Sequence, residues 1–276
     1  PPSSRMDTVA VTGGNGKIGE AILRDLVEHG YRAVNVARGK RREEVSDEYR
    51  TTDLLDAGEV YGSLAAADAD AIIHMGTIPT PTSHPGYRVF ESNAMSSYHV
   101  LEAATELGLE AVCLASSINV MGGVYQQAPM EVDYLPVDES HPVTPRDPYA
   151  LGKHAIEITA DGFGRRPDAP PVSSLRYPWV ATGEQLAETF AEADRTLDAD
   201  LPAVGGREDL FSYLHIEDGA RVARLAVEAD ISGHERFWVV ADDTTVETPT
   251  ADLAERIYPD ADARTSFEGT ETIVDT

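Results

Sequence analysis

Basic residues, and lysine above all, are scarce in this sequence. Its 276 residues include 48 Asp and Glu against 22 Lys and Arg, a formal net charge of -26. Nucleic acids and anionic membranes bind basic surfaces, so neither is an expected partner. Only three of the basic residues are lysines, namely Lys17, Lys40 and Lys153. A composition rich in acid and poor in lysine resembles that of salt-adapted proteins and predicts a halophilic protein; an ordinary acidic cytosolic protein is the alternative.

Cysteine and long apolar runs are also nearly absent. The one cysteine, Cys113, excludes an internal disulfide and a cysteine-based zinc site, and we expect no metal. It lies in the apolar run 111–114, which favours a buried strand position over a reactive thiol. No run approaches the roughly 18 to 20 apolar residues of a membrane helix, and the first residues have no apolar signal core. These absences predict a soluble cytoplasmic protein.

Short apolar runs alternate with amphipathic segments along most of the chain. Apolar residues spaced three or four apart, such as Ile18, Ile22 and Leu26, predict helices, and β-branched runs predict strands. Continuous apolar strands between amphipathic helices indicate a parallel sheet covered on both faces, so we predict an α/β, doubly wound Rossmann fold. The expected strands are 9–11, 33–37, 71–75, 111–115, 172–175 and 237–240, and the expected helices are 18–27, about 92–107, 148–160 and 218–229.

The pattern changes after Tyr177. Residues 178–210 read as loop and acidic helix, and the C-terminal segment is short and acidic. We expect a Rossmann domain over 6–176, to which 212–240 returns, and a small C-terminal substrate lobe formed by 177–211 and 241–276. The stretch 121–147 is punctuated by proline and glycine and is too long for an ordinary connection, which is typical of a functional loop.

A glycine-rich segment follows the first expected strand and opens the first expected helix. Gly13 permits the tight turn, Gly16 lets a pyrophosphate approach the backbone, and Gly19 lets helix and strand pack closely. The free N–H groups and positive dipole end of the helix would face the phosphates. A tight turn without a ligand is the alternative, but the strand–turn–helix context favours dinucleotide binding. The segment reads Thr12-Gly13-Gly14-Asn15-Gly16-Lys17-Ile18-Gly19.

The end of the second strand distinguishes the two nicotinamide cofactors. An acidic residue there would bind the ribose hydroxyls of NAD and repel a 2′-phosphate. Here Ala37 is followed by Arg38 and by the basic cluster 40–42. We expect Arg38 to contact a 2′-phosphate, so NADP is predicted over NAD. The alternative is a solvated loop whose positive charges pair with Glu43, Glu44 and Asp47.

Asp53 and Leu54 follow a further expected strand, which lies between the strands 33–37 and 71–75. The carboxylate of Asp53 can accept a hydrogen bond from the adenine amino group of a dinucleotide. It could equally cap the N-terminus of the following helix, and one side chain can do both.

Tyr149 and Lys153 are four residues apart on an expected helix, so they share a face. The lysine charge, with a positive nicotinamide ring, would lower the pKa of the tyrosine toward neutrality, as a general base requires. Ser116 and Ser117 follow the strand 111–115, at the sheet edge where ligands of such folds bind. A serine there can hydrogen-bond a substrate hydroxyl while Tyr149 takes its proton. An exposed helix pair and two turn serines are the ordinary alternatives.

These elements together resemble the extended short-chain dehydrogenase/reductase family, which holds nucleotide-sugar epimerases, dehydratases and sugar dehydrogenases. The resemblance runs from about Thr8 to Ala229, with the motifs in the expected order. It rests on the segments 12–19, 53–54, 73–77, 93 with 101–104, 116–122, 149–153, 175–178 and 215–218.

The resemblance implies a role for each catalytic position. Ser117, five residues before Gly122, matches the catalytic serine. Tyr149 matches the acid/base, and Lys153 matches its activator and the ribose anchor. Asn119, with the loop 121–147, would contact further hydroxyls of the substrate.

The resemblance also implies which residues contact the dinucleotide and that the protein forms a homodimer. Met75, Gly76 and Thr77 would run beneath the cofactor, with Thr77 reaching toward substrate. Asn93 and Pro178 match positions that touch the dinucleotide. Relatives pair through the helices around Asn93 and Tyr149, which predicts a homodimer. His215 and Asp218 match a segment for which a capping role is favoured over a catalytic one.

The departures from the family pattern narrow the expected function. Met121 replaces a common tyrosine, and the region after Tyr177 is short for a lobe that holds a nucleoside diphosphate. Ile118-Asn119 stands where uronate dehydrogenases have Asn-His. We therefore expect an NAD(P)-dependent oxidation of a free pentose or hexose at C1 to the lactone. The alternatives are a nucleotide-sugar epimerase or dehydratase with bound NAD, a uronate dehydrogenase whose Arg176 or Arg207 holds the carboxylate, and an NADP-sensing binding protein without catalysis.

Overall fold

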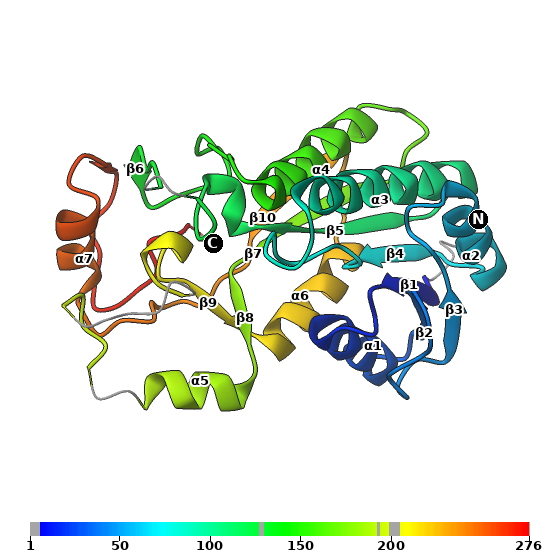
Figure 1. Cartoon of the computed structure of the whole chain (residues 1–276), viewed down its shortest axis with the longest axis horizontal. Coiled ribbons are helices and arrows are strands. Elements are labelled where there is room, and N and C mark those ends of the chain that lie inside the picture. The colour runs from blue at the N-terminus through cyan, green and yellow to red at the C-terminus, as the bar shows by residue number, and fades with distance from the viewer. Residues whose placement is uncertain (1–5, 127–129, 192–193, 199–204, 276) are drawn as a thin grey trace.

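The computed structural model describes residues 6–126, 130–191, 194–198 and 205–275. Its central sheet has seven strands in the order β10-β7-β5-β4-β1-β2-β3, and every neighbouring pair is parallel (Figure 1). The α/β, doubly wound Rossmann fold is thereby confirmed. The strands are β1 Thr8–Thr12, β2 Arg32–Ala37, β3 Glu48–Thr51, β4 Ala71–His74, β5 Ala111–Ser117, β7 Val172–Tyr177 and β10 His234–Trp238.

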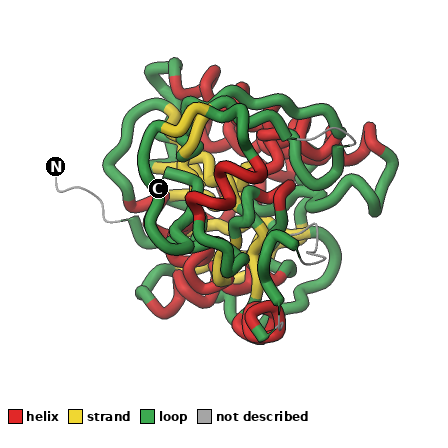
Figure 2. Tube along the Cα trace, turned by 90° about the vertical axis from the view of Figure 1, so that its left-hand side faces the viewer, coloured by secondary structure: helices red, strands yellow, loops and turns green. Residues whose placement is uncertain are grey.

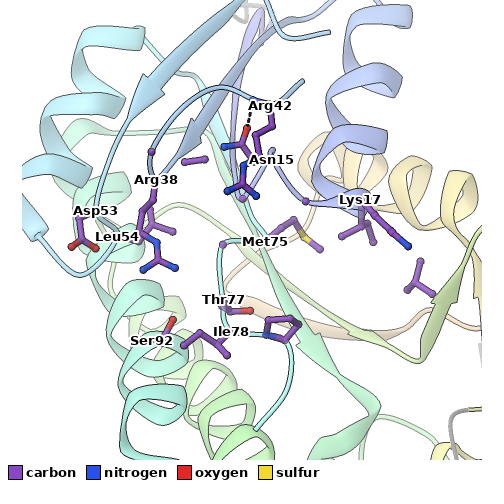
Figure 3. Close-up of a pocket in the computed structure, with 18 of the residues that line it drawn as sticks. Asn15, Lys17, Arg38, Arg42, Asp53, Leu54, Met75, Thr77, Ile78 and Ser92 are labelled. Carbon is purple, nitrogen blue, oxygen red and sulfur yellow. Dashed lines mark hydrogen bonds between the residues drawn. The ribbon is translucent and has the colours of Figure 1, made fainter. Parts of the chain in front are cut away.

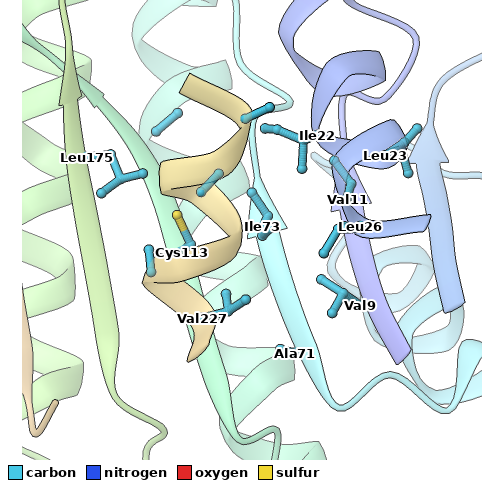
Figure 4. Close-up of a cluster of buried hydrophobic side chains, with 14 of the residues drawn as sticks. Val9, Val11, Ile22, Leu23, Leu26, Ala71, Ile73, Cys113, Leu175 and Val227 are labelled. Atoms are coloured by element: carbon cyan, nitrogen blue, oxygen red, sulfur yellow. The ribbon is translucent and has the colours of Figure 1, made fainter. Parts of the chain in front are cut away.

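Helices cover both faces of this sheet. Helices α1 (Lys17–Glu28) and α6 (Ile216–Glu228) lie on one face, and α2 (Ala57–Ala67), α3 (Gly86–Leu107) and α4 (Pro148–Gly164) lie on the other. Alternate residues of one strand serve the two layers: Val9 and Val11 pack toward α1 and α6, while Ala10 packs toward α2 and α3 (Figure 4). Both faces of the central strands are therefore buried, which explains why β1, β4 and β5 are mostly apolar, whereas the edge strand β3 is only partly buried. Figure 2 shows the strands enclosed by helices and loops.

A smaller C-terminal lobe adjoins the carboxyl ends of the strands. It contains β6 (Tyr134–Leu135) paired with β11 (Asp262–Ala263), β8 (Trp179–Ala181) paired with β9 (Tyr213–His215), the helices α5 (Gly183–Phe190) and α7 (Thr250–Ile257), and the short helix η2 (Arg207–Asp209). Its hydrophobic cluster also includes side chains from the segment after β5, among them Met121 and Leu135. The division at residue 177 stays a prediction, and residues 192–193 and 199–204 of the expected lobe lie outside the described residues.

Several elements begin or end elsewhere than the sequence pattern predicts. Helix α3 begins at Gly86, directly after Pro85, which is earlier than the sequence predicts. The pattern missed its first turns because Val89 is the one buried apolar residue in them. Strand β10 covers 234–238, the residues that pair with β7, whereas the apolar residues 239–240 lie beyond the pairing. Cys113 is fully buried in β5, as expected.

A buried ion network joins α4 to three strands. The Glu157 carboxylate accepts two hydrogen bonds from the Arg176 guanidinium at 2.9 Å each, one from Ser116 Oγ at 2.7 Å and one from Arg236 Nε at 3.1 Å. Arg176 also stacks over the Trp238 ring at 4.9 Å. This network fixes the end of β5 against α4, next to the residues described below.

Candidate active site

The glycine loop lies between β1 and α1, where the predicted turn occurs. Gly13 has φ +71, and a Cβ there would lie 2.9 Å from the Cα of Gly76. A Cβ at Gly19 would lie 2.3 Å from the carbonyl oxygen of Gly13. Only glycine fits both positions, because the first needs left-handed backbone and the second has no room. The loop brings the N-terminus of α1 to the edge of the sheet.

A cavity of about 900 Å³ opens in front of this loop (Figure 3). The N-terminus of α1, the end of β2 and the segment after β4 form its wall. Most predicted dinucleotide contacts line it: Gly13, Asn15, Gly16, Lys17, Ile18, Arg38, Asp53, Leu54, Met75, Gly76 and Thr77. Its wall also includes residues that sequence reasoning missed, among them Arg42, Arg88, Ser92 and Gln185. These come from segments without a motif, apart from Arg42, which belongs to the basic cluster already noted.

Two predicted dinucleotide contacts lie behind the wall instead of on it. Gly19 packs against the glycine loop, as described above. Asn93 is fully buried in α3, where its Oδ1 accepts a hydrogen bond from the backbone N–H of Ile78 at 3.0 Å. A Cβ at Gly152 of α4 would meet its Cβ at 2.9 Å. Asn93 therefore positions the segment after β4 and does not line either cavity.

The loop between β2 and β3 divides its basic residues between two roles. Arg41 donates to the Glu43 carboxylate and to the backbone of Ser46, so it is structural. Glu43 is buried, which would raise its pKa, but hydrogen bonds from Asn35, Ser46 and Val45 outweigh burial and lower the pKa to about 2. The predicted pairing with acids thus holds for Arg41, whereas Arg38 and Arg42 line the cavity (Figure 3).

Asp53 does not cap helix α2. The N-cap is Asp56, whose carboxylate accepts a hydrogen bond from the Glu59 backbone N–H at 3.0 Å. Asp53 accepts from the Leu55 backbone N–H at 3.1 Å in a turn and lines the cavity. The capping alternative was therefore wrong for Asp53, because the helix begins three residues later than the pattern suggested.

A second cavity, of about 360 Å³, adjoins the first and shares with it Ile18, Met75, Thr77, Pro79 and Val180. It lies between the carboxyl ends of β5 and β7, helix α4 and the C-terminal lobe. The predicted catalytic trio Ser117, Tyr149 and Lys153 lines it, together with the predicted residues Asn119 and Pro178. The structure thus brings together residues from the end of β5, the first turns of α4 and the segment after β7.

Each member of the trio is held by its local structure. Ser117 is the last residue of β5, and its Oγ accepts a hydrogen bond from the Asn119 backbone N–H at 3.1 Å. Ser116 also lines the cavity, but its hydroxyl donates to the buried Glu157 carboxylate at 2.7 Å, whereas the Ser117 hydroxyl is not committed to that network. Helix α4 begins at Pro148 with Asp147 as its N-cap, and this places Tyr149 in the first turn. Lys153, one turn further on, is 2% exposed.

The protein's own groups do not bring the pKa of Tyr149 toward neutrality, and the effect of Lys153 together with a bound nicotinamide ring stays a prediction. Its Nζ donates to Thr77 Oγ1 at 3.0 Å and to the Ala115 carbonyl at 2.6 Å. Burial raises the pKa of the Tyr149 phenol above its ordinary value, and the Ser117 hydroxyl opposes that rise only in part. Burial also lowers the pKa of Lys153 to about 7. The protein's own groups therefore keep the phenol protonated at neutral pH.

Neither arginine proposed as a carboxylate ligand lines the second cavity. Arg176 is committed to Glu157, and Arg207 donates to the carbonyl of Ile257 at 3.4 Å. Lys153 is the one basic side chain among the described residues on this wall. Sequence reasoning missed Tyr125, Trp179 and Asp209, which also line the cavity.

Other expectations concern residues outside the two cavities. His215 caps α6, and its Nδ1 accepts from the Glu217 backbone N–H at 3.3 Å, so the capping role is confirmed. None of the helices in the described parts of the chain is long and apolar enough to cross a membrane. The described residues also contain no group of three or more His, Cys, Asp or Glu side chains placed to hold a metal ion.

The parallel sheet and the glycine loop define a Rossmann-fold protein, and comparison with known families shows which family of such proteins it belongs to. A model of the NAD dependent epimerase/dehydratase family matches residues 9–241, and the chain belongs to this family. The putative UDP-glucose 4-epimerase of Methanocaldococcus jannaschii is 29% identical over 156 residues, which cover 54% of this chain and 48% of that relative. The chain thus spans about half the length of this relative.

Two further comparisons cover more of the chain. The uronate dehydrogenase of Pseudomonas syringae pv. tomato is 24% identical over 245 residues, which cover 89% of this chain and 77% of the relative. The solved structure of MoeE5 in complex with UDP-glucuronic acid and NAD has a TM-score of 0.69 at 19% identity and covers 98% of this chain and 90% of that chain. This structural likeness shows a shared fold.

Proposed function

We propose that this protein oxidises the C1 hydroxyl of a free, neutral aldose of the arabinose, galactose or glucose type to the lactone, with hydride transfer to a nicotinamide dinucleotide. The observation that carries the proposal is the composition of the second cavity: Ser117, Tyr149 and Lys153 stand beside the acidic Asp209, and none of the described residues that line it is an arginine. A uronate or a nucleoside diphosphate calls for guanidinium partners, whereas a neutral sugar needs only hydroxyl donors and acceptors.

A nicotinamide dinucleotide fits the first cavity. Gly13 and Gly16 line the cavity without side chains at the N-terminus of α1, so the first backbone N–H groups of the helix can face a pyrophosphate. In this proposal Asn15, Lys17 and Ile18 hold the pyrophosphate side, and Met75, Gly76 and Thr77 hold the nicotinamide side together with Pro178. When bound, the dinucleotide supplies the hydride acceptor and a positive charge.

The residues of the second cavity then have distinct tasks. Tyr149, as the phenolate, takes the proton of the C1 hydroxyl, because it is the phenol of this wall that lies one helical turn from Lys153. Lys153 supplies the positive charge that favours the phenolate and binds the nicotinamide ribose. Ser117 and Asn119 orient the sugar by hydrogen bonds, with Thr77 at the junction of the two cavities.

The direct test is an assay of reduced nicotinamide with a panel of free aldoses and uronic acids, each with NAD and with NADP, at high and low salt. The proposal expects turnover with at least one neutral aldose and a faster reaction than with any uronic acid. Faster turnover at high salt would support salt adaptation, which stays a prediction. Turnover confined to uronic acids would overturn the choice of substrate.

A nucleotide-sugar epimerase or dehydratase with resident NAD is the second candidate, favoured by the match to UDP-glucose 4-epimerases. It expects no net reduction with any free sugar and a dinucleotide that co-purifies with the protein. Release of the dinucleotide by denaturation and its identification by mass spectrometry distinguish the two candidates.

We further propose that NADP is preferred over NAD. Arg38 and Arg42 line the cavity near the end of β2, where Ala37 stands in place of an acid. Guanidinium groups bind phosphate oxygens in pairs of hydrogen bonds. Replacing Arg38 with Ser is expected to weaken NADP binding by about 10- to 100-fold and to leave NAD binding within about threefold. Isothermal titration with each dinucleotide measures both constants.

Lys40→Ser is the matched control for this prediction. Lys40 belongs to the same loop and is exposed, but it is not on the cavity wall. Its replacement removes the same charge and is expected to change NADP affinity only slightly. Equal losses of NAD and NADP binding in the Arg38 variant would show that the residue shapes the loop and does not read the 2′-phosphate.

The homodimer predicted from the family resemblance is also proposed here. Helices α3 and α4 pack side by side and expose large apolar residues, namely Tyr87, Phe90, Met95, Leu151 and Ile158. Ile158→Glu is expected to convert a dimer into a monomer, since it places a charge in the surface of α3 and α4 that the dimer would bury. Sedimentation velocity measures the change. Leu225→Glu on α6, also at an exposed apolar residue, is the control and should leave the dimer intact.

A further inference from the structure

A buried carboxylate lies on the wall of the second cavity. Asp209 ends η2 and is 3% exposed. It lines the same cavity as Ser117 and Tyr149. Burial is the main reason why the pKa of Tyr149 is raised, and the negative charges of Asp209 and Asp147 add to it. The carboxylate and the phenol therefore face one space from two different parts of the fold.

The lobe holds Asp209 in place through a strained turn. The Gly205 backbone N–H donates to its Oδ2 at 2.9 Å. The next two residues, Leu210 and Phe211, both have φ 53, a left-handed conformation that large side chains rarely adopt. Both side chains are buried in the hydrophobic cluster of the lobe. Packing thus overcomes the strain and fixes the carboxylate at the cavity wall.

One oxygen of this carboxylate remains available to a ligand. Its Oδ2 accepts the bond from Gly205, and Oδ1 has no hydrogen-bond partner among the described residues. The cation of the cavity, Lys153, is committed to Thr77 and Ala115. Burial raises the pKa of Asp209 to about 6, which the bond from Gly205 counteracts and the charge of Glu208 reinforces. At neutral pH an anion with an open acceptor faces the cavity, and it attracts hydroxyl donors.

The same charge works against acidic ligands. A carboxylate or phosphate on a sugar would bring a second negative charge into a partly buried cavity, where like charges repel strongly. We infer that Asp209 is a substrate-binding residue that selects neutral polyhydroxylated sugars: its Oδ1 accepts hydrogen bonds from sugar hydroxyls, and its charge excludes uronic acids and sugar phosphates. This inference rests on the proposed sugar oxidation and names the residue that sets its substrate class.

Asp209→Asn tests the inference, because it removes the charge and keeps the size of the side chain. The KM for the neutral aldose that the wild type oxidises is expected to rise by about 10- to 100-fold, since a charge-assisted hydrogen bond is lost. The kcat should stay within about threefold, because the group binds substrate and takes no part in proton transfer. The ratio of kcat/KM for uronic acid to that for aldose should rise by about 100-fold.

Glu208→Gln is the matched control. Glu208 precedes Asp209 and carries the same charge, but it does not line the cavity. The control variant should keep the wild-type KM and the wild-type preference for neutral sugars. A rise of KM in both variants alike would overturn the inference, because it would trace the effect to the turn or to overall charge.

Sugar binding is measured separately through the fluorescence of Trp179, which lines the cavity. Neutral sugars that bind the wild type and bind Asp209→Asn at least tenfold more weakly support the inference, whether or not turnover is seen. Such binding without turnover would overturn the proposed oxidation alone. Equal affinities in wild type and Asp209→Asn, tighter binding of uronic acids by the wild type, or no binding of any free sugar would overturn the inference.

Discussion

Replacing Tyr149 with Phe is expected to lower the rate of sugar oxidation by roughly 10³-fold, within the range that general acid–base groups contribute. The change removes only the phenolic oxygen, and the ring keeps its place against Tyr125, where the two centroids are 5.9 Å apart. Because Tyr149 lines the second cavity and not the first, the dissociation constant of the dinucleotide should stay within about threefold. Steady-state kinetics and titration calorimetry measure the two quantities.

Tyr125→Phe is the control for this variant. Tyr125 lines the same cavity, and its replacement removes an equivalent hydroxyl, but it belongs to the loop after β5 and not to the helix that carries Lys153. Its activity is expected to fall by less than about tenfold. Loss of dinucleotide binding in Tyr149→Phe with activity retained would contradict the assignment of Tyr149 as the acid/base.

Replacing Glu157 with Gln is expected to lower the free energy of unfolding by about 3 to 5 kcal/mol, because it leaves the buried Arg176 guanidinium without its anion. Arg236 and Ser116 lose the same partner. For a chain of this size the change corresponds to a fall of roughly 6 to 20 °C in the melting temperature. Calorimetry measures the fall, and the exposed Glu106→Gln in α3 serves as a control that should stay within about 0.5 kcal/mol.

The stabilisation by Glu157 also has a defined pH dependence. Burial would raise the pKa of this carboxyl, but Arg176, Ser116 and Arg236 outweigh burial and hold it below the ordinary value of 4.5. A lowered folded-state pKa gives stability that is complete above the unfolded-state pKa and is lost as pH falls through the folded-state value. The difference in melting temperature between wild type and Glu157→Gln should therefore be constant at neutral pH and shrink in acid. A difference that grows in acid would contradict the ion pair as its source.

Local sequence was sufficient for the fold class and for most of the residues that line the first cavity. The strands are short and apolar on both faces, the helices are amphipathic, and Gly13 and Gly19 stand where the backbone leaves no room for a side chain. Each of these patterns lies within a single turn, helix or strand, so it can be recognised without knowing how the rest of the chain folds. The predicted starts of two helices were wrong: α3 begins earlier, at Gly86, and the N-cap of α2 is Asp56 and not Asp53.

The sequence by itself determined a parallel Rossmann sheet, a dinucleotide loop and the positions of Ser117, Tyr149 and Lys153. Tertiary structure alone decided the surroundings of these residues. It buried Asn93 behind the cavity, paired Arg176 with Glu157 and brought Asp209 from the C-terminal lobe to the wall of the cavity. The physical reason is that charge pairing and burial act between residues far apart in sequence, and no local pattern records which distant side chain will satisfy a buried charge.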